Sequence, residues 1–341
     1  MSSKFSYQPH WIREDFVDFI LQKIQPTLAW KRVLAAVTAQ QMLSADMLQL
    51  TLKPNHNFDF APLQAGQSVL LTVNIQGVNQ QRSYSIIDVT AQGEIRLGIK
   101  VQGLVSKAIQ QLQVGDCVEI SQAQGDFVLH QGRQPAVLIA SGSGITAIYA
   151  LLMQALEQQL DEIYVLYFNR DEVLHQDILA LAKQHPQLHY HFFNTTQHKQ
   201  HLDADLLARL VPNFKELPTY ACGHAQMMRQ AQSIYSEHAA AQNLHQEFFQ
   251  PLQVNSTAEA QQVFFRLAQQ NFTASGSLLS SAEQAGLRPQ HGCRMGVCNR
   301  CSCTKVSGVT QNILTGEIDD QPNRQIKLCV SQALSTVTIN L

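Results

Sequence analysis

The stretch His291-Gly292-Cys293-Arg294-Met295-Gly296-Val297-Cys298-Asn299-Arg300-Cys301 decides the fold of the last part of this chain. Its three cysteines are spaced C-x4-C-x2-C, and Cys329 follows much later. This is the plant-type spacing for a 2Fe-2S cluster, in which each iron requires tetrahedral sulfur ligation. Gly292 and Gly296 allow a tight loop. The spacing predicts a cluster held by four metal ligands: Cys293, Cys298, Cys301 and Cys329.

Two other kinds of site also use closely spaced thiols. A structural zinc site usually has two CxxC-like pairs, whereas here the first gap is four residues and the last cysteine stands alone. Cys298 and Cys301 could instead form a CxxC redox pair. The spacing favours the iron–sulfur cluster over both.

The loop resembles the ferredoxin domain of flavin reductases that carry a C-terminal cluster. Its run from Gly292 to Cys298, followed by Thr315-Gly316-Glu317-Ile318, is most similar to the reductases that serve bacterial fatty-acid desaturases. Asn299 stands where the usual ferredoxin loop has Gly after the second cysteine, which affects the shape of the loop and not the ligation. The resemblance implies a β-grasp ferredoxin-like domain over residues 248–341.

Length and composition exclude several classes of protein. A chain of 341 residues suggests two or three domains with real cores. The net charge of -2 shows no overall excess of basic residues, so nucleic-acid binding is disfavoured. Seven cysteines and no export signal at Met1 indicate a cytoplasmic protein. The apolar window from Ala136 to Leu156 is interrupted by Ser141-Gly142-Ser143-Gly144, so it predicts a strand, loop and helix and no transmembrane segment.

Residues 1–32 predict an N-terminal extension with an amphipathic helix from about Pro9 to Gln25. Its apolar residues recur at helical spacing, and Pro26 ends it; they are Ile12, Phe16, Ile20 and Ile24. We expect this side to pack against the first domain. Docking to a membrane-bound partner is the alternative, but Glu14, Asp15 and Asp18 argue against attraction to anionic lipid. The extension, through Trp30 and Arg32, also resembles that of the desaturase reductases.

Residues 33–132 predict an antiparallel β-barrel, because short strands alternate with turn signals. The expected strands are Val33 to Val37, Leu48 to Leu52, Ser68 to Val73, Ser83 to Ile87, Ile95 to Val101 and Val118 to Ile120. Cys117 is expected to be a small core residue of the last strand.

The run Arg82-Ser83-Tyr84-Ser85 resembles the RxYS motif of the ferredoxin reductase superfamily. A flavin site needs an aromatic plane for the ring, a cation for phosphate and a hydrogen-bond donor near the reactive N5. Tyr84, Arg82 and Ser85 can provide them, with Ser85 in the catalytic role. Alternating polar and aromatic residues also describe an ordinary strand.

A second run, Gly103-Leu104-Val105-Ser106, opens a short predicted helix from Ser106 to Gln111. Its backbone N–H groups and the Ser106 hydroxyl predict an anion site for a flavin pyrophosphate. The alternative is that Ser106 merely caps the helix after a turn glycine. Two family motifs in order within one barrel favour FAD, with FMN as the alternative.

Residues 133–247 alternate strands and helices, which predicts a parallel α/β nucleotide-binding domain. The expected strands are Ala136 to Ala140, Ile163 to Phe168, His189 to Phe193 and Thr219 to Cys222. The expected helices are Ala147 to Gln159, His175 to Gln184, Ala204 to Leu210 and Ala225 to His238.

The nucleotide site is predicted where Ser141-Gly142-Ser143-Gly144-Ile145-Thr146 joins the first of these strands to its helix. Glycines there let the backbone approach a pyrophosphate. Relatives usually have Pro where this chain has Ala147 and His224. In the family, the cysteine of Cys222-Gly223 lies beside the nicotinamide, so the resemblance gives Cys222 that catalytic position. The loss of both prolines predicts looser nucleotide binding.

Arg170 follows the second strand of this domain, where the sheet edge would meet the adenosine ribose. An arginine there can bind a 2'-phosphate, which favours NADPH slightly. Asp171 and Glu172 are adjacent, and a carboxylate at this place is typical of sites that bind the ribose hydroxyls of NADH. Four histidines lie nearby without cysteines or clustered acids, so they are expected to be solvated or half-buried and not a metal site; they are His189, His191, His198 and His201.

The last domain follows a join at His245 to Pro251. A strand is expected from Val263 to Leu267 and a short helix from Ser280 to Ala285. Cys303 is expected to be a packed strand residue. Four basic residues flank the cysteine loop and predict charge compensation plus a weak docking patch for an acidic partner; they are Arg288, Arg294, Arg300 and Lys305.

The resemblance implies an NAD(P)H-dependent ferredoxin reductase-type electron transferase, in which electrons pass from NAD(P)H through FAD and a 2Fe-2S cluster to an external oxygen-activating acceptor. It further implies that the acceptor is a membrane-bound fatty-acid desaturase, which would place the protein at the membrane through its partner. One alternative acceptor is a soluble oxygenase acting on aromatic rings or phenylacetyl-type thioesters. An alternative of another class is a redox sensor or docking module without turnover, suggested by Ala147 and His224.

Overall fold

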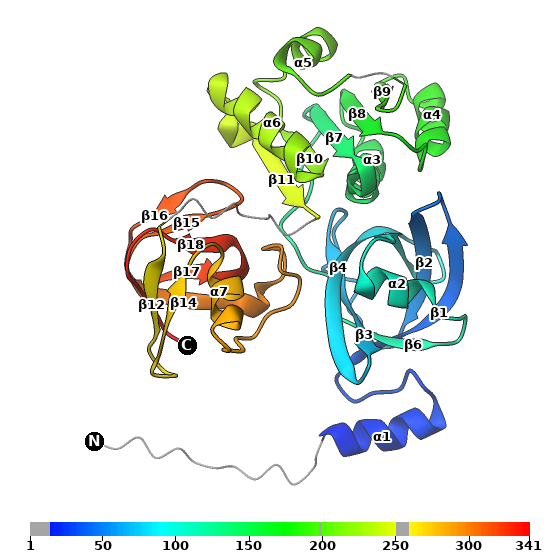
Figure 1. Cartoon of the computed structure of the whole chain (residues 1–341). Coiled ribbons are helices and arrows are strands. Elements are labelled where there is room, and N and C mark those ends of the chain that lie inside the picture. The colour runs from blue at the N-terminus through cyan, green and yellow to red at the C-terminus, as the bar shows by residue number, and fades with distance from the viewer. Residues whose placement is uncertain (1–13, 198–199, 250–258) are drawn as a thin grey trace.

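Three groups of strands follow one another in the computed structural model, which describes residues 14–197, 200–249 and 259–341 (Figure 1). A helix, α1 (Glu14–Ile24), precedes them. A closed antiparallel barrel comes first, a parallel sheet with helices second and a mixed sheet last. This confirms the predicted fold class.

The barrel has six strands in the order β1-β2-β5-β4-β3-β6. Alternate residues of each strand point inward, so its interior fills with branched aliphatic side chains. The helix α2 (Leu104–Gln110) packs against β3 and β4. The strands are β1 (Val33–Met42), β2 (Met47–Pro54), β3 (Ser68–Ile75), β4 (Val78–Val89), β5 (Ile95–Lys100) and β6 (Cys117–Ile120).

The second group is a parallel sheet of five strands in the order β11-β10-β7-β8-β9. One core lies under α3 and α4 and another under α5 and α6, so both faces of the sheet are covered. The strands are β7 (Ala136–Ser141), β8 (Ile163–Asn169), β9 (Leu188–Asn194), β10 (Thr219–Gly223) and β11 (Leu244–Phe248). The helices are α3 (Ile145–Glu157), α4 (His175–Gln184), α5 (Ala204–Leu210), α6 (Ala225–Glu237) and two 3-10 turns, η1 (Gly142–Gly144) and η2 (Ala241–Asn243).

Strand β11 was not predicted. Residues 245–248 fall in the segment that the sequence indicated as a join, because three polar residues in a row, His245-Gln246-Glu247, give neither strict alternation nor an apolar run. An edge strand buries only part of its surface, so its pattern is weaker than that of the buried strand β7. The parallel sheet therefore extends to Phe248.

The third group is a mixed sheet in the order β13-β12-β19-β14-β17, with a smaller sheet β16-β15-β18 beside it. The helix α7 (Leu278–Gln284) packs on β13, and Ser277 caps its N-terminus. A mixed sheet against one helix agrees with the β-grasp plan. The other elements are β12 (Gln261–Phe265), β13 (Gln270–Ala274), η3 (Asn299–Cys301), β14 (Ser302–Ser307), β15 (Thr310–Asn312), β16 (Ile318–Asp319), β17 (Arg324–Lys327), η4 (Leu328–Val330), β18 (Ser331–Ala333) and β19 (Val337–Ile339).

The N-terminal helix corrects one prediction. Phe16, Ile20 and Ile24 are exposed, so the expectation that they pack against the barrel is wrong. Instead, the side turned to the barrel holds Asp18, which is buried and ion-paired to Arg32. The ion pair of Asp18 with Arg32, and not apolar packing of Phe16, Ile20 and Ile24, therefore holds this helix to the barrel. Residue Ile12 of the same prediction lies outside the described residues.

Cys117 corrects another prediction, because it is exposed at the start of β6. Its Sγ donates a hydrogen bond to the Pro26 carbonyl at 3.3 Å, so it contacts the turn after α1 and not the core. Cys303, by contrast, is buried in β14 as expected. Of the four histidines, His189 and His191 are half-buried on β9 and His201 is exposed, while His198 lies outside the described residues.

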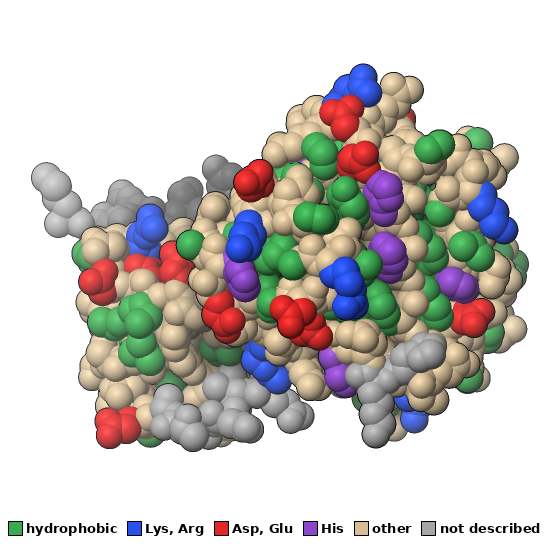
Figure 2. Space-filling model, turned by 90° about the horizontal axis from the view of Figure 1, so that it is seen from above, with side chains coloured by type: hydrophobic (Ala, Val, Ile, Leu, Met, Phe, Trp, Pro, Cys, Tyr) green, Lys and Arg blue, Asp and Glu red, His purple; other side chains and the backbone are tan. Residues whose placement is uncertain are grey.

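Charged side chains of both signs are interspersed on the face shown in Figure 2, as the small net charge of the chain suggests. None of the helices in the described ranges has the length and apolar content needed to cross a bilayer.

Candidate functional site

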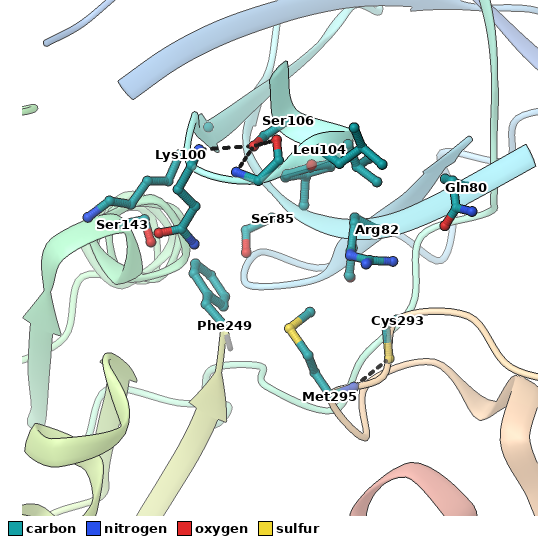
Figure 3. A pocket seen from close by; sticks show the side chains of 16 residues that line it. Gln80, Arg82, Ser85, Lys100, Leu104, Ser106, Ser143, Phe249, Cys293 and Met295 are labelled. Carbon is teal, nitrogen blue, oxygen red and sulfur yellow. Dashed lines mark hydrogen bonds between the residues drawn. The ribbon is translucent and has the colours of Figure 1, made fainter. Parts of the chain in front are cut away.

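A pocket opens where the barrel, the parallel sheet and the cysteine loop meet (Figure 3). Two stretches that are separate in sequence line it together, residues 82–85 of β4 and residues 103–106 at the start of α2. The structure thus brings together all eight predicted flavin residues: Arg82, Ser83, Tyr84, Ser85, Gly103, Leu104, Val105 and Ser106.

Ser85 is the residue that best tests whether a flavin fits. Its side chain is buried and points into the pocket, and its Oγ has no hydrogen-bond partner in the described part of the chain. An unsatisfied buried hydroxyl costs about 1–3 kcal/mol, so a ligand atom that bonds to it would remove this cost. The pocket also holds Arg82, whose Nη1 donates to the Gln81 carbonyl at 2.7 Å. Burial lowers the pKa of Arg82, so a bound anion would be favoured beside it.

Ser106 departs from its predicted role. Its Oγ accepts hydrogen bonds from the backbone N–H groups of Gln102 and Gly103, both at 3.0 Å, and donates to the Gly103 carbonyl. The hydroxyl therefore holds the turn before α2 together from the third residue of the helix, whose N-cap is Gly103 and not Ser106 as the alternative stated. Any anion at this place would be bound by neighbouring groups and not by a free Ser106 hydroxyl.

A second pocket lies at the carboxyl ends of β7, β8 and β10, the edge at which parallel sheets bind ligands. Of the residues predicted for the nucleotide, four line it: Gly142, Ser143, Arg170 and Gly223. Ile145 and Thr146 are buried and do not line either pocket. Thr146 Oγ1 instead donates to the Ser143 carbonyl at 3.0 Å, which shapes the turn.

Two of the predicted nucleotide residues act through packing. A Cβ on Gly144 would lie 2.1 Å from the Cys222 carbonyl oxygen, so glycine is needed where α3 approaches β10. Cys222 is fully buried and does not line either pocket. Burial raises the pKa of its thiol well above the ordinary value, helped by the nearby Glu247. Its predicted place beside the nicotinamide remains a prediction.

His224 fills the place where relatives have proline. Its Nδ1 lies 2.5 Å from Ser141 Oγ, and that Oγ also accepts a hydrogen bond from the His224 backbone N–H at 3.1 Å. Burial lowers the pKa of His224, and the charges of Lys100 and His201 add to this. These hydrogen bonds between Ser141 and His224 hold the turn after β10 in place, which the proline ring does in the relatives.

Sequence reasoning missed six residues that line the flavin pocket: Gln80, Gly98, Lys100, Gln102, Phe249 and Met295. Phe249 lines both pockets, and Lys100 does so from the end of β5. Met295, from the cysteine loop, reaches into the flavin pocket from the opposite side to Ser85 (Figure 3). Phe249 follows the unpredicted strand β11, and Met295 was seen only as a spacer between ligands.

The four predicted cluster ligands form two pairs. The backbone N–H of Cys293 donates to Cys298 Sγ at 3.1 Å, and that of Cys298 donates to Cys293 Sγ at 3.2 Å. Cys301 Sγ lies 3.3 Å from Cys329 Sγ. The side-chain hydrogen bond between the two thiols lowers the pKa of Cys298 and raises that of Cys293, so the pair shares a proton when no metal is bound.

Two pairs of thiols fit the donor set of a two-iron centre, because each iron of a 2Fe-2S cluster takes two cysteine sulfurs. The loop also contacts the barrel, since Arg300 Nη1 donates to Gln81 Oε1 on β4 at 2.7 Å.

The predicted basic docking patch is wrong for two of its four residues. Arg294 forms a bidentate pair with Glu283 of α7, at 2.8 and 2.6 Å. Lys305 is fully buried, and its Nζ donates to the Asp319 carbonyl at 2.5 Å. The acids that pair with them come from segments distant in sequence, so the run appeared unopposed.

Two protein-family models match the chain. "Oxidoreductase FAD-binding domain" matches residues 34–129, which include the barrel, and "Oxidoreductase NAD-binding domain" matches residues 138–233, which cover most of the parallel sheet. Together they span more than half of the chain. The FAD-binding model covers most residues that line the first pocket, and the NAD-binding model covers most residues that line the second. The chain belongs to the ferredoxin reductase-type FAD- and NAD-binding oxidoreductases.

Known proteins of this kind resemble the reductase over different lengths. An NADPH oxidoreductase of Mycobacterium tuberculosis is 26% identical over 338 residues, which cover 95% of this chain and 88% of that protein. A flavohemoprotein of Chromobacterium violaceum is 32% identical over 239 residues, and the reductase spans only 59% of its length. The crystal structure of phthalate dioxygenase reductase, described as modular for electron transfer from pyridine nucleotides to [2Fe-2S], has a TM-score of 0.62 at 20% identity, covering 91% of this chain and 98% of that one.

Proposed function

We propose that this protein passes electrons from NAD(P)H through FAD and a 2Fe-2S cluster to an external oxygen-activating acceptor, and that the acceptor is a membrane-bound fatty-acid desaturase. One observation carries the proposal. The flavin pocket is lined by residues of the barrel, of the parallel sheet and of the cysteine loop, represented by Ser85, Ser143 and Cys293. Sites for a hydride donor and a one-electron carrier thus adjoin one flavin site.

The chain's own residues would bind and orient these groups. When bound, FAD accepts a hydride from NAD(P)H and gives up single electrons, which a 2Fe-2S cluster carries one at a time. Ser85 would donate its free hydroxyl to the flavin ring, and Arg82 would neutralise a phosphate. Phe249 borders both pockets and would exclude water from the place where flavin and nicotinamide meet.

The thiols of Cys293, Cys298, Cys301 and Cys329 would hold the cluster. Backbone N–H groups already point at the Cys293 and Cys298 sulfurs, and such hydrogen bonds stabilise thiolate ligands. Lys327 Nζ donates to the Gly296 carbonyl at 2.5 Å and so fixes the loop between these two ligands.

Replacing Cys298 by Ser tests the cluster, with Cys303→Ser as the matched control. Both thiols are buried in the same domain, but only Cys298 belongs to a pair of proposed ligands. We expect Cys298→Ser to lose bound iron and to lower NADPH-dependent cytochrome c reduction by about a hundredfold or more, while ferricyanide, which takes electrons from the flavin directly, is still reduced. Cys303→Ser should change neither. Zinc in the purified protein, or full cytochrome c reduction by Cys298→Ser, would contradict the proposal.

The acceptor needs a separate experiment. The desaturase is supported by the resemblance of the cysteine loop and of the N-terminal extension, whereas a soluble oxygenase is supported by the likeness to phthalate dioxygenase reductase. Membranes that contain the desaturase should form unsaturated acyl chains when the protein and NADPH are added. Turnover of a soluble ring-cleaving oxygenase alone would favour the second acceptor. Absence of any NADPH oxidation with flavin and iron both bound would favour the redox sensor.

Arg170 is the residue that we propose for NADPH preference. It lines the nucleotide pocket and is exposed, and its Nη2 lies 3.3 Å from Asp46 Oδ2 of the barrel. We expect Arg170→Gln to raise KM for NADPH about tenfold more than KM for NADH, because a charged hydrogen bond to the 2'-phosphate is worth about 1.5–3 kcal/mol. Asp46→Asn is the control, since it frees the arginine and should lower KM for NADPH. Equal effects on both nucleotides would exclude this role.

A further inference from the structure

The helix α1 presents large apolar side chains to solvent. Phe16, Ile20 and Ile24 follow one another at intervals of one turn, and Phe19 borders them. These four side chains are between 46% and 75% exposed. Two aromatic and two aliphatic side chains on one side of an eleven-residue helix form a continuous apolar face rather than scattered surface residues.

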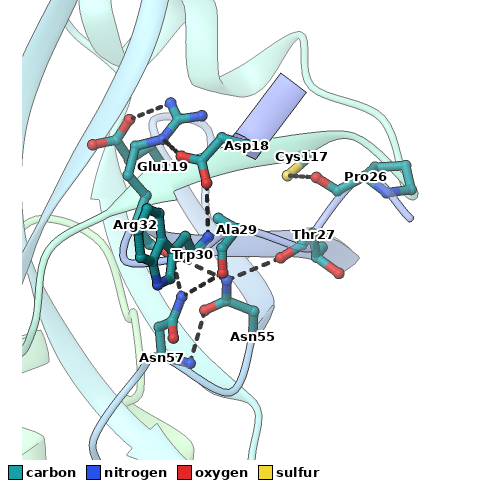
Figure 4. A network of polar contacts seen from close by, with 10 residues as sticks. All are labelled: Asp18, Pro26, Thr27, Ala29, Trp30, Arg32, Asn55, Asn57, Cys117 and Glu119. Carbon is teal, nitrogen blue, oxygen red and sulfur yellow. Dashed lines mark hydrogen bonds and ion pairs between the residues drawn. The ribbon is translucent and has the colours of Figure 1, made fainter. Parts of the chain in front are cut away.

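Asp18 lies on the side of this helix that is turned to the barrel, where its charge is neutralised (Figure 4). Asp18 accepts a hydrogen bond from the Trp30 backbone N–H at 2.7 Å and pairs with Arg32 Nε at 2.7 Å. Burial acts to raise the pKa of Asp18, but these bonds outweigh it and the pKa is lowered. Glu14 pairs with Lys31. Of the carboxylates that oppose binding to anionic lipid in the sequence pattern, Asp18 is therefore held in a buried ion pair and Glu14 in an exposed one.

The outward face carries a cation. Lys23 lies one turn after Phe19, with its ammonium 5.3 Å from the centre of the Phe19 ring. An apolar face with a lysine whose stem lies along it is the arrangement of helices that rest in a membrane interface. Residues 1–13 contain Lys4, Tyr7, Trp11 and Arg13 and no Asp or Glu, so the sequence that leads into α1 adds basic and amphipathic aromatic residues.

We propose that α1 is a membrane-docking helix whose face of Phe16, Phe19, Ile20 and Ile24 enters the interface of an anionic bilayer, with Lys23 at the headgroups. The charge of this face and of the preceding residues complements anionic lipid, which favours a bilayer over a second copy of the chain. The helix lies at the end of the barrel away from the parallel sheet (Figure 1), so docking leaves the nucleotide pocket open. The inference does not depend on the identity of the electron acceptor.

Co-sedimentation of the full-length holoprotein with lipid vesicles tests this. Wild type should bind vesicles of phosphatidylcholine with phosphatidylglycerol more tightly than vesicles of phosphatidylcholine alone. We expect the double variant Phe16→Ser/Ile20→Ser to bind at least about tenfold more weakly, because it removes two apolar side chains from the buried face. Val114→Ser/Leu267→Ser is the matched control, since it removes two equally exposed apolar side chains elsewhere. Lys23→Gln should reduce the preference for anionic vesicles.

Fluorescence gives a readout that does not depend on sedimentation. The two tryptophans of the chain, Trp11 and Trp30, both flank α1 in sequence, so brominated lipids should quench them in wild type and less in the double variant. NADPH–ferricyanide turnover should be the same in all variants, and a protein that bound vesicles without turnover would contradict the reductase proposal alone. Three results would overturn the inference. The first is that wild type does not bind vesicles, the second is that the control variant loses as much vesicle binding as the double variant, and the third is that wild type is a dimer that the double variant converts to a monomer. So would binding only to membranes that contain an acceptor protein.

Discussion

Glu247 carries a carboxyl group buried between the parallel sheet and the cysteine loop. It lies on β11 opposite Cys222 of β10, and its Oε2 has no partner among the residues that the structure describes. Burial raises the pKa of Glu247 to about 8 from a value of 4.5. The folded protein therefore holds a proton there that the unfolded chain releases at lower pH.

The sign of the resulting pH dependence follows from this shift. The folded pKa is higher than the unfolded one, so the contribution of Glu247 to the free energy of unfolding is most favourable below pH 4.5 and becomes less favourable as the pH rises to about 8. At pH 7 the loss is about 3 kcal/mol. We expect Glu247→Gln to raise the melting temperature at pH 7–8 and to change it little at the acidic end. The exposed Glu237→Gln is the control, and an unchanged pH profile in Glu247→Gln would contradict the assignment.

Residue types with a fixed chemical role were predictable at this scale. Ser85 and Arg82 were singled out because a flavin needs a donor and a cation, and they line one pocket. The four cysteines were singled out because iron needs thiolates, and their role as ligands stays a prediction. Phe249 and Met295 were missed because an apolar side chain in a pocket has the same sequence pattern as one in a core. Lys305 was misread because its partner, Asp319, is brought near only by the fold.

Individual elements followed their patterns wherever one face was buried. Apart from β11, each strand of the barrel and of the parallel sheet overlaps its predicted range, since period and turn residues both mark them, although β1 ends and β4 begins five residues outside that range. The direction in which α1 faces was not predictable. Its apolar spacing is the same whether that side faces the barrel or away from it, and the ion pair of Asp18 with Arg32 turns the polar side to the barrel.

The contact of β5 with α3 joins the barrel to the nucleotide-binding sheet, and Gly98 makes it possible. A Cβ on Gly98 would lie 2.1 Å from Thr146 Cγ2 and 3.1 Å from Met47 Cε. Because Thr146 is β-branched and buried, it cannot move aside without moving α3.

We therefore expect Gly98→Ala to destabilise the protein by about 1–3 kcal/mol and to slow flavin reduction by NADPH. Thermal unfolding and stopped-flow absorbance measure the two effects. Thr146→Ser removes the clashing methyl and keeps the hydroxyl that bonds to Ser143, so the double variant should recover most of both losses. Equal losses in the single and double variants would show that the clash with Thr146 is not the cause.

In the whole molecule, residues of three segments that are separate in sequence line one pocket. The motifs did not predict that the cysteine loop would border it. That contact depends on Leu70 of β3, whose neighbours Val69 and Leu71 face the barrel interior while it faces outward. Leu70 packs against Cys293, Met295 and Cys298 and is only 1% exposed.

This arrangement makes Leu70 the residue on which the seating of the last domain can be tested. Leu70→Ser places a hydroxyl in an apolar contact, and removal of a buried leucine side chain costs about 2–5 kcal/mol. Because the cost falls on the contact between barrel and loop, we expect cytochrome c reduction to fall about tenfold with ferricyanide reduction unchanged. Small-angle scattering should show a larger radius of gyration. Val78→Ser, at an exposed position on β4, should leave both unchanged, whereas a parallel loss of both activities in Leu70→Ser would mean that the barrel itself has been damaged and that the contact has no separate role.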